Sequence, residues 1–267
     1  MDIQDEGTGN SCRFDANAFD AGASLTINGN DNKIEIGPAI DARAPKITIE
    51  GDGNTIRLGA DRVATATPAD IPTRPFLLHH SERAPVIDIL GDRNTIISGG
   101  PVQLYDSTIQ IVGDANAMRI GSWVRAHLRI DFQTNDGTFA IGDQTTAVAL
   151  QASLHEPRQL RIGEDCQISA DIYITVSDTH PIIDLTTGER INEAGDVIVG
   201  DHVWLGFKST VLKGCTIGNG STVGTCGVVT GDLPENCVAV GNPARVVREN
   251  VTWAREFTQT GECTKHD

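Results

Sequence analysis

Aliphatic residues recur at every sixth position between residues 196 and 229. The series is Val199, Leu205, Val211, Ile217, Val223 and Val229. From Leu205 onward, the positions two residues earlier hold mostly small side chains, and four of the six aliphatic residues are followed by glycine. A spacing of six matches neither the 3.6-residue period of a helix nor the two-residue period of an ordinary strand. It predicts a solenoid with three flat sides per coil, in which each side points one aliphatic residue at the axis.

A second pattern, an apolar strand followed by a Gly/Asx turn and another strand, occurs four times in the N-terminal half. The four copies carry the glycine and the asparagine at the same spacing and are Ile27–Asn32, Ile49–Asn54, Ile89–Asn94 and Ile111–Asn116. An apolar residue follows two positions after each of these asparagines. Repetition at a fixed spacing predicts further coils from Ala23 to Gly121, stacked on the same axis and less regular than the later ones.

Two segments interrupt the repeats. The stretch 62–85 contains four prolines and is predicted to be an inserted loop, and the stretch Ser177–Gly195 leaves the six-residue period. After Gly241-Asn242-Pro243 the pattern stops, and residues 244–257 are predicted to form a short capping helix, with a frayed tail after Gly261. The sequence thus divides into N-terminal coils (1–160), regular hexapeptide coils (161–243) and a C-terminal helix and tail (244–267).

Composition supports a thin repeating fold and excludes several kinds of partner. Aromatic residues make up 4% of the chain and glycine occurs 28 times, which suits stacked layers better than one thick core. The formal net charge of -15 argues against nucleic acid as a partner. No apolar run reaches the roughly 20 residues of a membrane span. The acidic N-terminus lacks a secretory signal, and the six cysteines contain no CxxC pair, so a reduced, cytoplasmic protein is expected.

The region 178–247 resembles a known family. The residues that carry the resemblance are Thr179-His180-Pro181, the run Val199–Gly206 (V-G-D-H-V-W-L-G) and the run Val240–Val247 (V-G-N-P-A-R-V-V). They are similar to those of the hexapeptide-repeat acetyltransferases. The run Ser177–Asp184, followed by Arg190-Ile191-Asn192, looks like the branch that O-acetylates capsular and other surface polysaccharides. The resemblance implies a left-handed parallel β-helix, acetyl-CoA as co-substrate, and a homotrimer with active sites between subunits.

His180 is the candidate general base of such a reaction. Imidazole changes its charge near neutral pH, and a segment that leaves the repeat can project this residue into a cleft. Asp178 or Asp184 is a candidate to orient the ring or contact the acceptor, and a backbone carbonyl is an open alternative. The resemblance implies that Trp204 lines the acyl-donor site across a subunit interface. We interpret His202 as a surface residue of a hexapeptide turn.

The cofactor slot is expected to follow the regular coils. By their positions in the motif, the resemblance implies that Gly206, Gly224 and Thr225 line the pantetheine arm. Arg245 and Arg248 are candidates for the nucleotide phosphates, since guanidinium groups match phosphate oxygens, although a solvated end cap explains them equally well. Many relatives carry a lysine near the cofactor where this chain has Gly231, which weakens the assignment of the nucleotide end.

The leading hypothesis is transfer of an acetyl group from acetyl-CoA to a hydroxyl of a bacterial surface glycan. One alternative is a sugar N-acyltransferase of the same fold, and another is a non-catalytic β-helical scaffold. A zinc-dependent hydratase of the γ-carbonic-anhydrase kind is disfavoured because no histidine pair shows a recognisable ligand spacing, so no metal is expected.

Overall fold

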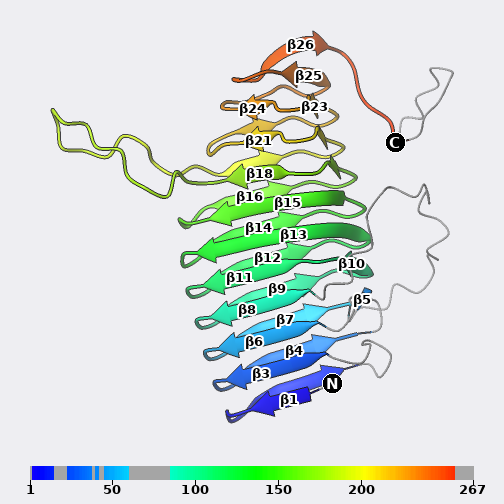
Figure 1. Ribbon diagram of the computed structural model, residues 1–267, viewed down its shortest axis with the longest axis vertical. Helices are drawn as coiled ribbons and strands as arrows, with labels where there is room; N and C mark the ends of the chain where they lie inside the picture. Colours follow the sequence, from blue (N-terminus) through cyan, green and yellow to red (C-terminus); the bar gives the residue numbers. More distant parts are fainter. Residues whose placement is uncertain (1, 15–22, 38–39, 42–44, 60–84, 256–267) are drawn as a thin grey trace.

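The computed structural model describes residues 2–14, 23–37, 40–41, 45–59 and 85–255. Within them the chain winds into a tall parallel β-helix, with the first strand at one end and the last at the other (Figure 1). None of these residues is helical. Accordingly, no helix in the described part is long and apolar enough to cross a membrane. The predicted Pro-rich loop at 62–85 lies outside the described residues, except for Pro85.

The strands of the described residues fall into two sheets. The nine-stranded sheet contains β2 (Ser11–Phe14), β4 (Lys33–Ile36), β7 (Thr55–Leu58), β9 (Thr95–Ser98), β12 (Ala117–Ile120), β14 (Thr138–Ile141), β16 (Gln159–Ile162), β19 (Val197–Val199) and β22 (Thr216–Ile217). The 17-stranded sheet contains β1 (Asp2–Asp5), β3 (Ser24–Asn28), β5 (Ile40–Asp41), β6 (Lys46–Glu50), β8 (Val86–Leu90), β10 (Val102–Leu104), β11 (Thr108–Val112), β13 (Val124–Gln133), β15 (Thr146–Leu154), β17 (Gln167–Ile168), β18 (Ile172–Thr175), β20 (Trp204–Leu205), β21 (Thr210–Val211), β23 (Thr222–Val223), β24 (Val228–Val229), β25 (Cys237–Val240) and β26 (Arg245–Glu249). Both sheets run from the N-terminal coils into the hexapeptide coils, so the two halves share one axis.

The repeated Gly-x-x-Asn turns of the N-terminal half stack on one another. Asn32, Asn54, Asn94 and Asn116 are almost fully buried. The backbone N–H of each of these asparagines donates to the side-chain oxygen of the corresponding asparagine in the preceding coil. The separation along this ladder is 22 residues where no insertion intervenes, so these coils are longer than three hexapeptides.

The glycine of each such turn lies against the turn of the next coil. A Cβ at Gly51, whose φ is 142°, would come within 2.2 Å of the backbone oxygen of Gly91. Only glycine permits both this φ and this approach. The recurring spacing of glycine and asparagine therefore follows from one stacked turn.

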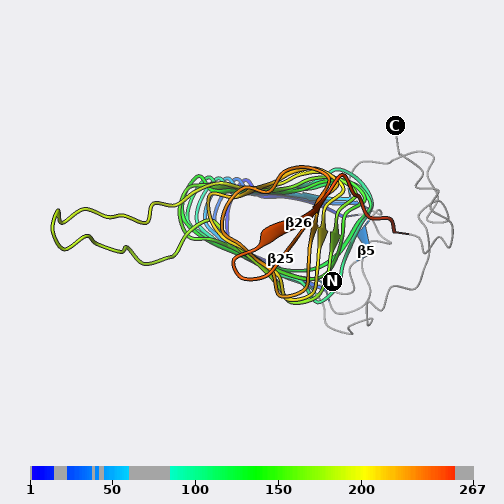
Figure 2. The ribbon, with the colours of Figure 1, turned by 90° about the horizontal axis from the view of Figure 1, so that it is seen from above.

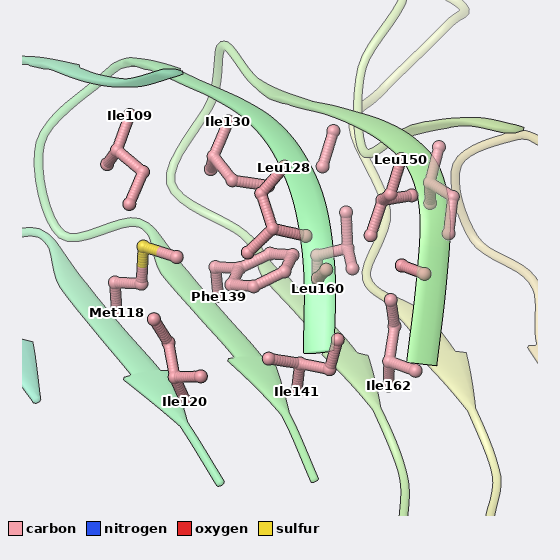
Figure 3. Packing of buried hydrophobic residues seen from close by; sticks show 14 of the residues in the cluster. Ile109, Met118, Ile120, Leu128, Ile130, Phe139, Ile141, Leu150, Leu160 and Ile162 are labelled. Carbon is pink, nitrogen blue, oxygen red and sulfur yellow. The ribbon is translucent and has the colours of Figure 1, made fainter. Parts of the chain in front are cut away.

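The core is a set of aliphatic columns. Met118, Phe139 and Leu160 occupy aligned positions of β12, β14 and β16, and Ile120, Ile141 and Ile162 form the neighbouring column (Figure 3). Each coil adds its own buried side chains beneath the next, so burial extends along the axis rather than into one centre.

The hexapeptide coils are shorter and have three corners. Asp201 and Asn219, on successive coils, are 18 residues apart. The first corner contains residues 200–203, the second 206–209 and the third 212–215. The aliphatic positions of the period-six series are buried, as predicted for residues that point at the axis.

The segment 177–195 leaves the third corner between β18 and β19 and projects far from the solenoid (Figures 1 and 2). We call it the projection. After β26 the chain descends along the edge of the solenoid that lies opposite the projection (Figures 1 and 2). The projection and the C-terminal segment are therefore on opposite sides of the same coils.

The predicted helix at 244–257 is wrong for the described part of that range. Residues 245–249 form β26, which pairs antiparallel with β25, and residues 251–255 have no regular structure. The physical reason is the last coil, since β25 would otherwise leave its backbone groups unpaired at the end of the sheet. Val246 and Val247 also suit a strand better than a helix, because they branch at Cβ. The predicted tail after Gly261 lies outside the described residues.

Candidate active site

Hydrogen bonds and an ion pair to Glu156 hold both ends of the projection, at Ser177 and at Arg190. We call the residues of the projection next to the solenoid, with their contacts, its root. The guanidinium of Arg190 donates to both carboxylate oxygens of Glu156, over 2.9 and 2.6 Å. The hydroxyl of Ser177 donates to the same carboxylate over 2.6 Å. The hydrogen bonds from Arg190 and Ser177 lower the pKa of Glu156 to about 2. Bidentate geometry of this kind fixes direction as well as distance, so both ends of the projection are tied to the coil below.

A second set of contacts surrounds His180. The side chain of Asn192 is buried and donates to the backbone oxygen of His180 over 2.9 Å and to Asp178 over 2.8 Å, while its oxygen accepts from the N–H of Ile182 over 2.6 Å. Lys213 donates to the same oxygen of Asp178 over 2.5 Å. The hydrogen bond from Lys213, followed by that from Asn192, lowers the pKa of Asp178. The backbone on both sides of His180 is thereby fixed.

The imidazole of His180 is exposed and has no hydrogen-bond partner among the described residues. Asp178 is held by Lys213 and Asn192, and Asp184 accepts from the backbone N–H groups of Thr186 and Thr187. Within this chain neither carboxylate binds the His180 ring. The arrangement presents an exposed imidazole on a backbone held by hydrogen bonds, where it can reach a proton of a second molecule.

Thr179 and His155 form a third part of the root, which we did not expect from the sequence. His155 Nδ1 lies 2.9 Å from Thr179 Oγ1, and its Nε2 lies 3.0 Å from Asp131 Oδ2. Both partners are 24 residues from His155. The strands of these coils pair at a spacing of 22 residues, Asp131 with Ser153 and Ser153 with Thr175. Both contacts therefore reach two residues beyond the strand register, and the coil spacing alone does not predict them.

Trp204 lies on the face between the first and second corners. Its side chain is 37% exposed, and its indole N–H donates to Ser169 Oγ over 3.2 Å. Trp253, from the C-terminal segment, packs beside it at 6.3 Å between ring centroids. Trp204 is thus fixed on one side and open to solvent on the other.

The residues predicted to bind the cofactor line the same face. Thr222, Val238 and Arg248 follow Trp204 along one column of paired strands. Gly224, Val240 and Arg245 follow Gly206 along the neighbouring column. At about 4.8 Å per strand, each column spans about 14 Å. Thr225 is exposed beside Gly224. The structure therefore brings Trp204, both glycines, Thr225 and both arginines onto one wall.

The same geometry separates His180 from this wall within one chain. The projection leaves the third corner, whereas Trp204 lies on the face opposite that corner. Trp204 packs against Trp253, and the segment that carries Trp253 runs on the edge away from the projection (Figure 2). One chain therefore carries the two predicted catalytic residues on opposite sides of its solenoid.

His202 lies in a turn and is partly exposed, but it makes specific contacts that the interpretation as a surface residue did not include. Its Nδ1 lies 2.7 Å from Asp165 Oδ2, its Nε2 lies 3.0 Å from the backbone oxygen of Trp253, and its ring stacks on Trp253 at 4.4 Å. Arg255 extends the contact by donating to Asp165 over 2.6 Å. The partners of His202 are 37 and 51 residues away in the sequence, so no local pattern reveals them.

His202→Ala is expected to lower the free energy of unfolding by about 1–3 kcal/mol at pH 6, because it removes a charge-assisted hydrogen bond and a stacked ring. The hydrogen bond with Asp165 raises the pKa of His202 above 6.5. A raised folded pKa stabilises the fold fully below pH 6.5, and this contribution is lost as the pH rises through the folded pKa. Burial acts to raise the pKa of Asp165, but hydrogen bonds from His202 and Arg255 outweigh it and the pKa is lowered.

The measurement is urea unfolding of the wild type and His202→Ala at pH 6 and at pH 9. We expect the difference between them to shrink at the higher pH. A difference that is equal at both pH values would show that the charge of His202 contributes nothing.

Comparisons with known proteins agree with this architecture. No protein-family model matches the chain. A polysialic acid O-acetyltransferase of Neisseria meningitidis is 34% identical over 172 residues, which are 64% of this chain and 80% of that protein. A polysialic acid O-acetyltransferase of Escherichia coli is 35% identical over 122 residues, which are 46% of this chain and span 40% of that protein's length. Among solved structures, the polySia-specific acetyltransferase NeuO covers 98% of this chain and 91% of its own, with 24% identity and a TM-score of 0.51.

The chain belongs to the hexapeptide-repeat acetyltransferase family, in the branch that contains the polysialic acid O-acetyltransferases. Its fold is the left-handed parallel β-helix of that family. Among the described residues, no three His, Cys, Asp or Glu side chains gather closely enough to hold a metal ion.

Proposed function

We propose that the protein transfers the acetyl group of acetyl-CoA to a hydroxyl of a bacterial surface glycan, with His180 as the general base. The observation that carries the proposal is the exposed, unpaired imidazole of His180 on a backbone fixed by Asn192. The related proteins of Neisseria and Escherichia are named for O-acetylation of polysialic acid. A sialic-acid polymer is therefore the first acceptor to test.

His180 takes the proton of the acceptor hydroxyl while the hydroxyl oxygen attacks the carbonyl carbon of the thioester. The tetrahedral intermediate carries its negative charge on the former carbonyl oxygen. Collapse of this intermediate breaks the carbon–sulfur bond, and the proton held by His180 passes to the departing CoA sulfur. The products are the O-acetyl ester and CoA, and the imidazole returns to its neutral form.

The wall of Trp204 supplies the place for acetyl-CoA. The exposed indole face and the small residues Gly206 and Gly224 leave room for a narrow acyl arm beside Thr225. Arg245 and Arg248 stand at the far end of the wall, where their guanidinium groups suit the phosphates of the nucleotide. The length of the wall, about 14 Å, fits an extended ligand rather than a compact one.

A complete site then needs two copies of the chain. The opposite placement of His180 and Trp204 leaves each without the other inside one chain, and a homotrimer joins the projection of one copy to the wall of the next. The projection carries exposed aliphatic side chains that suit such a contact, at 45% to 99% exposure: Ile182, Ile183, Leu185 and Ile191. We place this trimer in the cytoplasm, since all five described cysteines are free thiols.

Leu185→Asp is expected to dissociate the trimer and leave each solenoid folded, because Leu185 is 99% exposed in a single chain and a buried, unpaired charge is costly at an interface. Sedimentation at micromolar concentration checks the mass, and circular dichroism checks the strands. Thr186→Asp, on the adjacent residue, is the control for added charge. A wild type that sediments as a monomer and retains full activity would contradict the intersubunit site.

The proposed reaction is tested by incubating the protein with labelled acetyl-CoA and a panel of glycans that includes polysialic acid, a neutral polysaccharide and an amino sugar nucleotide. We expect label in a glycan and its release by mild base, since esters hydrolyse there and amides do not. The formal net charge of -15 also predicts weaker binding of a polyanionic acceptor at low salt, because the unscreened charges repel. Base-stable label would favour the N-acyltransferase alternative. If the protein does not bind acetyl-CoA at millimolar concentration, the alternative of a non-catalytic scaffold is favoured.

A further inference from the structure

Asp131, His155 and Thr179 are joined by hydrogen bonds across three successive coils. Asp131 lies in β13, His155 follows β15, and Thr179 follows β18 at the root of the projection. The two hydrogen bonds measure 3.0 and 2.9 Å and join the three side chains in that order. This hydrogen-bonded series ends at Thr179, the residue directly before His180. The reaction proposed above assigns no role to these three side chains.

Thr179 has an unusual backbone. Its φ is 68°, and the N–H of His180 donates to the oxygen of Asp178 over 2.7 Å. This three-residue ring is a γ-turn, and the positive φ belongs to the rarer and more strained of its two forms. Threonine branches at Cβ and is disfavoured at positive φ. Surrounding contacts must therefore hold the turn.

Two contacts hold Thr179, and both come from outside the turn. Its N–H donates to Ser177 Oγ over 2.9 Å, and its hydroxyl is bound to His155. On the other side of the base, Asn192 binds the backbone oxygen of His180. Since Pro181 restricts the backbone of His180 further, the remaining freedom of the backbone that carries the imidazole lies at Thr179.

We propose that Asp131 and His155 are a positioning pair that holds the Thr179 turn and thereby aims the His180 imidazole at the acceptor. The inference rests on the proposed role of His180 as base. With Nε2 of His155 protonated, its N–H donates to Asp131 Oδ2, and Nδ1 accepts the Thr179 hydroxyl hydrogen. Asp131, His155 and Thr179 transfer no proton to the substrates during the reaction, and Thr179 forms no covalent bond with them.

The pair is buried enough to act as a rigid support. The side chain of His155 is 18% exposed and that of Asp131 is 26% exposed. Gln133 donates to the same Asp131 oxygen over 3.0 Å, so the carboxylate is itself oriented. A misplacement of about 1 Å at a reacting group can cost about 10²-fold in rate, which makes such support relevant to turnover.

The test uses Thr179→Val, which keeps the shape and removes the hydroxyl, and His155→Ala, which removes the support. Each is expected to lower kcat about 10- to 100-fold and to leave both KM values within about twofold. Thr179→Ser keeps the hydroxyl and is expected to keep most of kcat. Thr187→Val is the matched control on the same projection. The double variant is expected to be no worse than the poorer single variant, because both changes remove the same hydrogen bond between His155 and Thr179.

A second readout does not depend on activity. The ring nitrogen signals of His180 in NMR are expected to be sharp in the wild type and in Thr187→Val, and broadened in Thr179→Val and His155→Ala. If the wild type transfers no acetyl group, the proposed function fails, and the NMR comparison still decides the positioning role. Unchanged His180 signals in both variants would overturn the inference. So would kcat values equal to that of the wild type, or a Thr179 that becomes acetylated during turnover.

Discussion

His180→Ala is expected to lower the turnover of acetyl transfer about 10²- to 10⁴-fold, the usual cost of losing a general base. This corresponds to about 3–5 kcal/mol of transition-state stabilisation. The free energy of unfolding should change by less than about 0.5 kcal/mol, because the His180 side chain is exposed and has no partner among the described residues. The affinity for acetyl-CoA should also remain, since the wall that we assign to it lies on the opposite face.

The measurements are steady-state kinetics, calorimetric titration with CoA and urea unfolding. Glu189→Gln is the matched control, because Glu189 is an exposed residue of the same projection. A His180→Ala variant with at least a tenth of the wild-type turnover would remove His180 from the role of base.

Trp204→Ala is expected to lower kcat/KM for acetyl-CoA about 30- to 1000-fold, because a partly buried tryptophan at the centre of a contact is worth about 2–4 kcal/mol. The larger part of the loss should be in the affinity for the donor. Trp204→Phe keeps an aromatic face and should retain more of the affinity. Ser169→Ala removes only the hydrogen bond that Trp204 makes over 3.2 Å and separates the role of that bond from the role of the ring.

Calorimetric titration with acetyl-CoA measures the affinity, and sedimentation checks that the assembly is intact. If Trp204→Ala binds acetyl-CoA as the wild type does, the wall from Trp204 to Arg248 is not the donor site. If the affinity falls only because the subunits separate, Trp204 is an interface residue alone.

The regular coils were predictable because their signal is local. Every sixth residue from Val199 to Val229 faces the axis for the same reason, and the six-residue spacing indicates this directly. The stacked turns of the N-terminal half were predictable in the same way. The sequence spacing from Gly51 to Asn54 recurs in three other turns. Their coil length of 22 residues escaped the six-residue template, since only a comparison between copies reveals it.

The predicted helix at 244–257 does not form in residues 245–249 because tertiary surroundings override local helix propensity there. Ala244 and the charged residues after it are compatible with a helix. The unpaired edge of β25 is a feature of the last coil, and it decides the conformation of residues 245–249. The partners of His202 and His155 were missed for a related reason, because they meet across coils. The sequence motif was enough to group the residues of the wall. The contacts that hold the backbone of His180 come from residues far apart in the sequence, and only the structure reveals them.

The most direct test of the account is complementation between two inactive variants, because the central claim is that His180 and Trp204 of different copies form one acetyl-transfer site. His180→Ala and Trp204→Ala subunits are unfolded together in equal amounts, refolded as mixed trimers and assayed for acetyl transfer. An interface that joins the intact projection of a Trp204→Ala subunit to the intact wall of a His180→Ala subunit regains both residues. Random assembly of a cyclic trimer then restores about one quarter of the wild-type activity. Mixed trimers that are no more active than the two parent variants would contradict the intersubunit site.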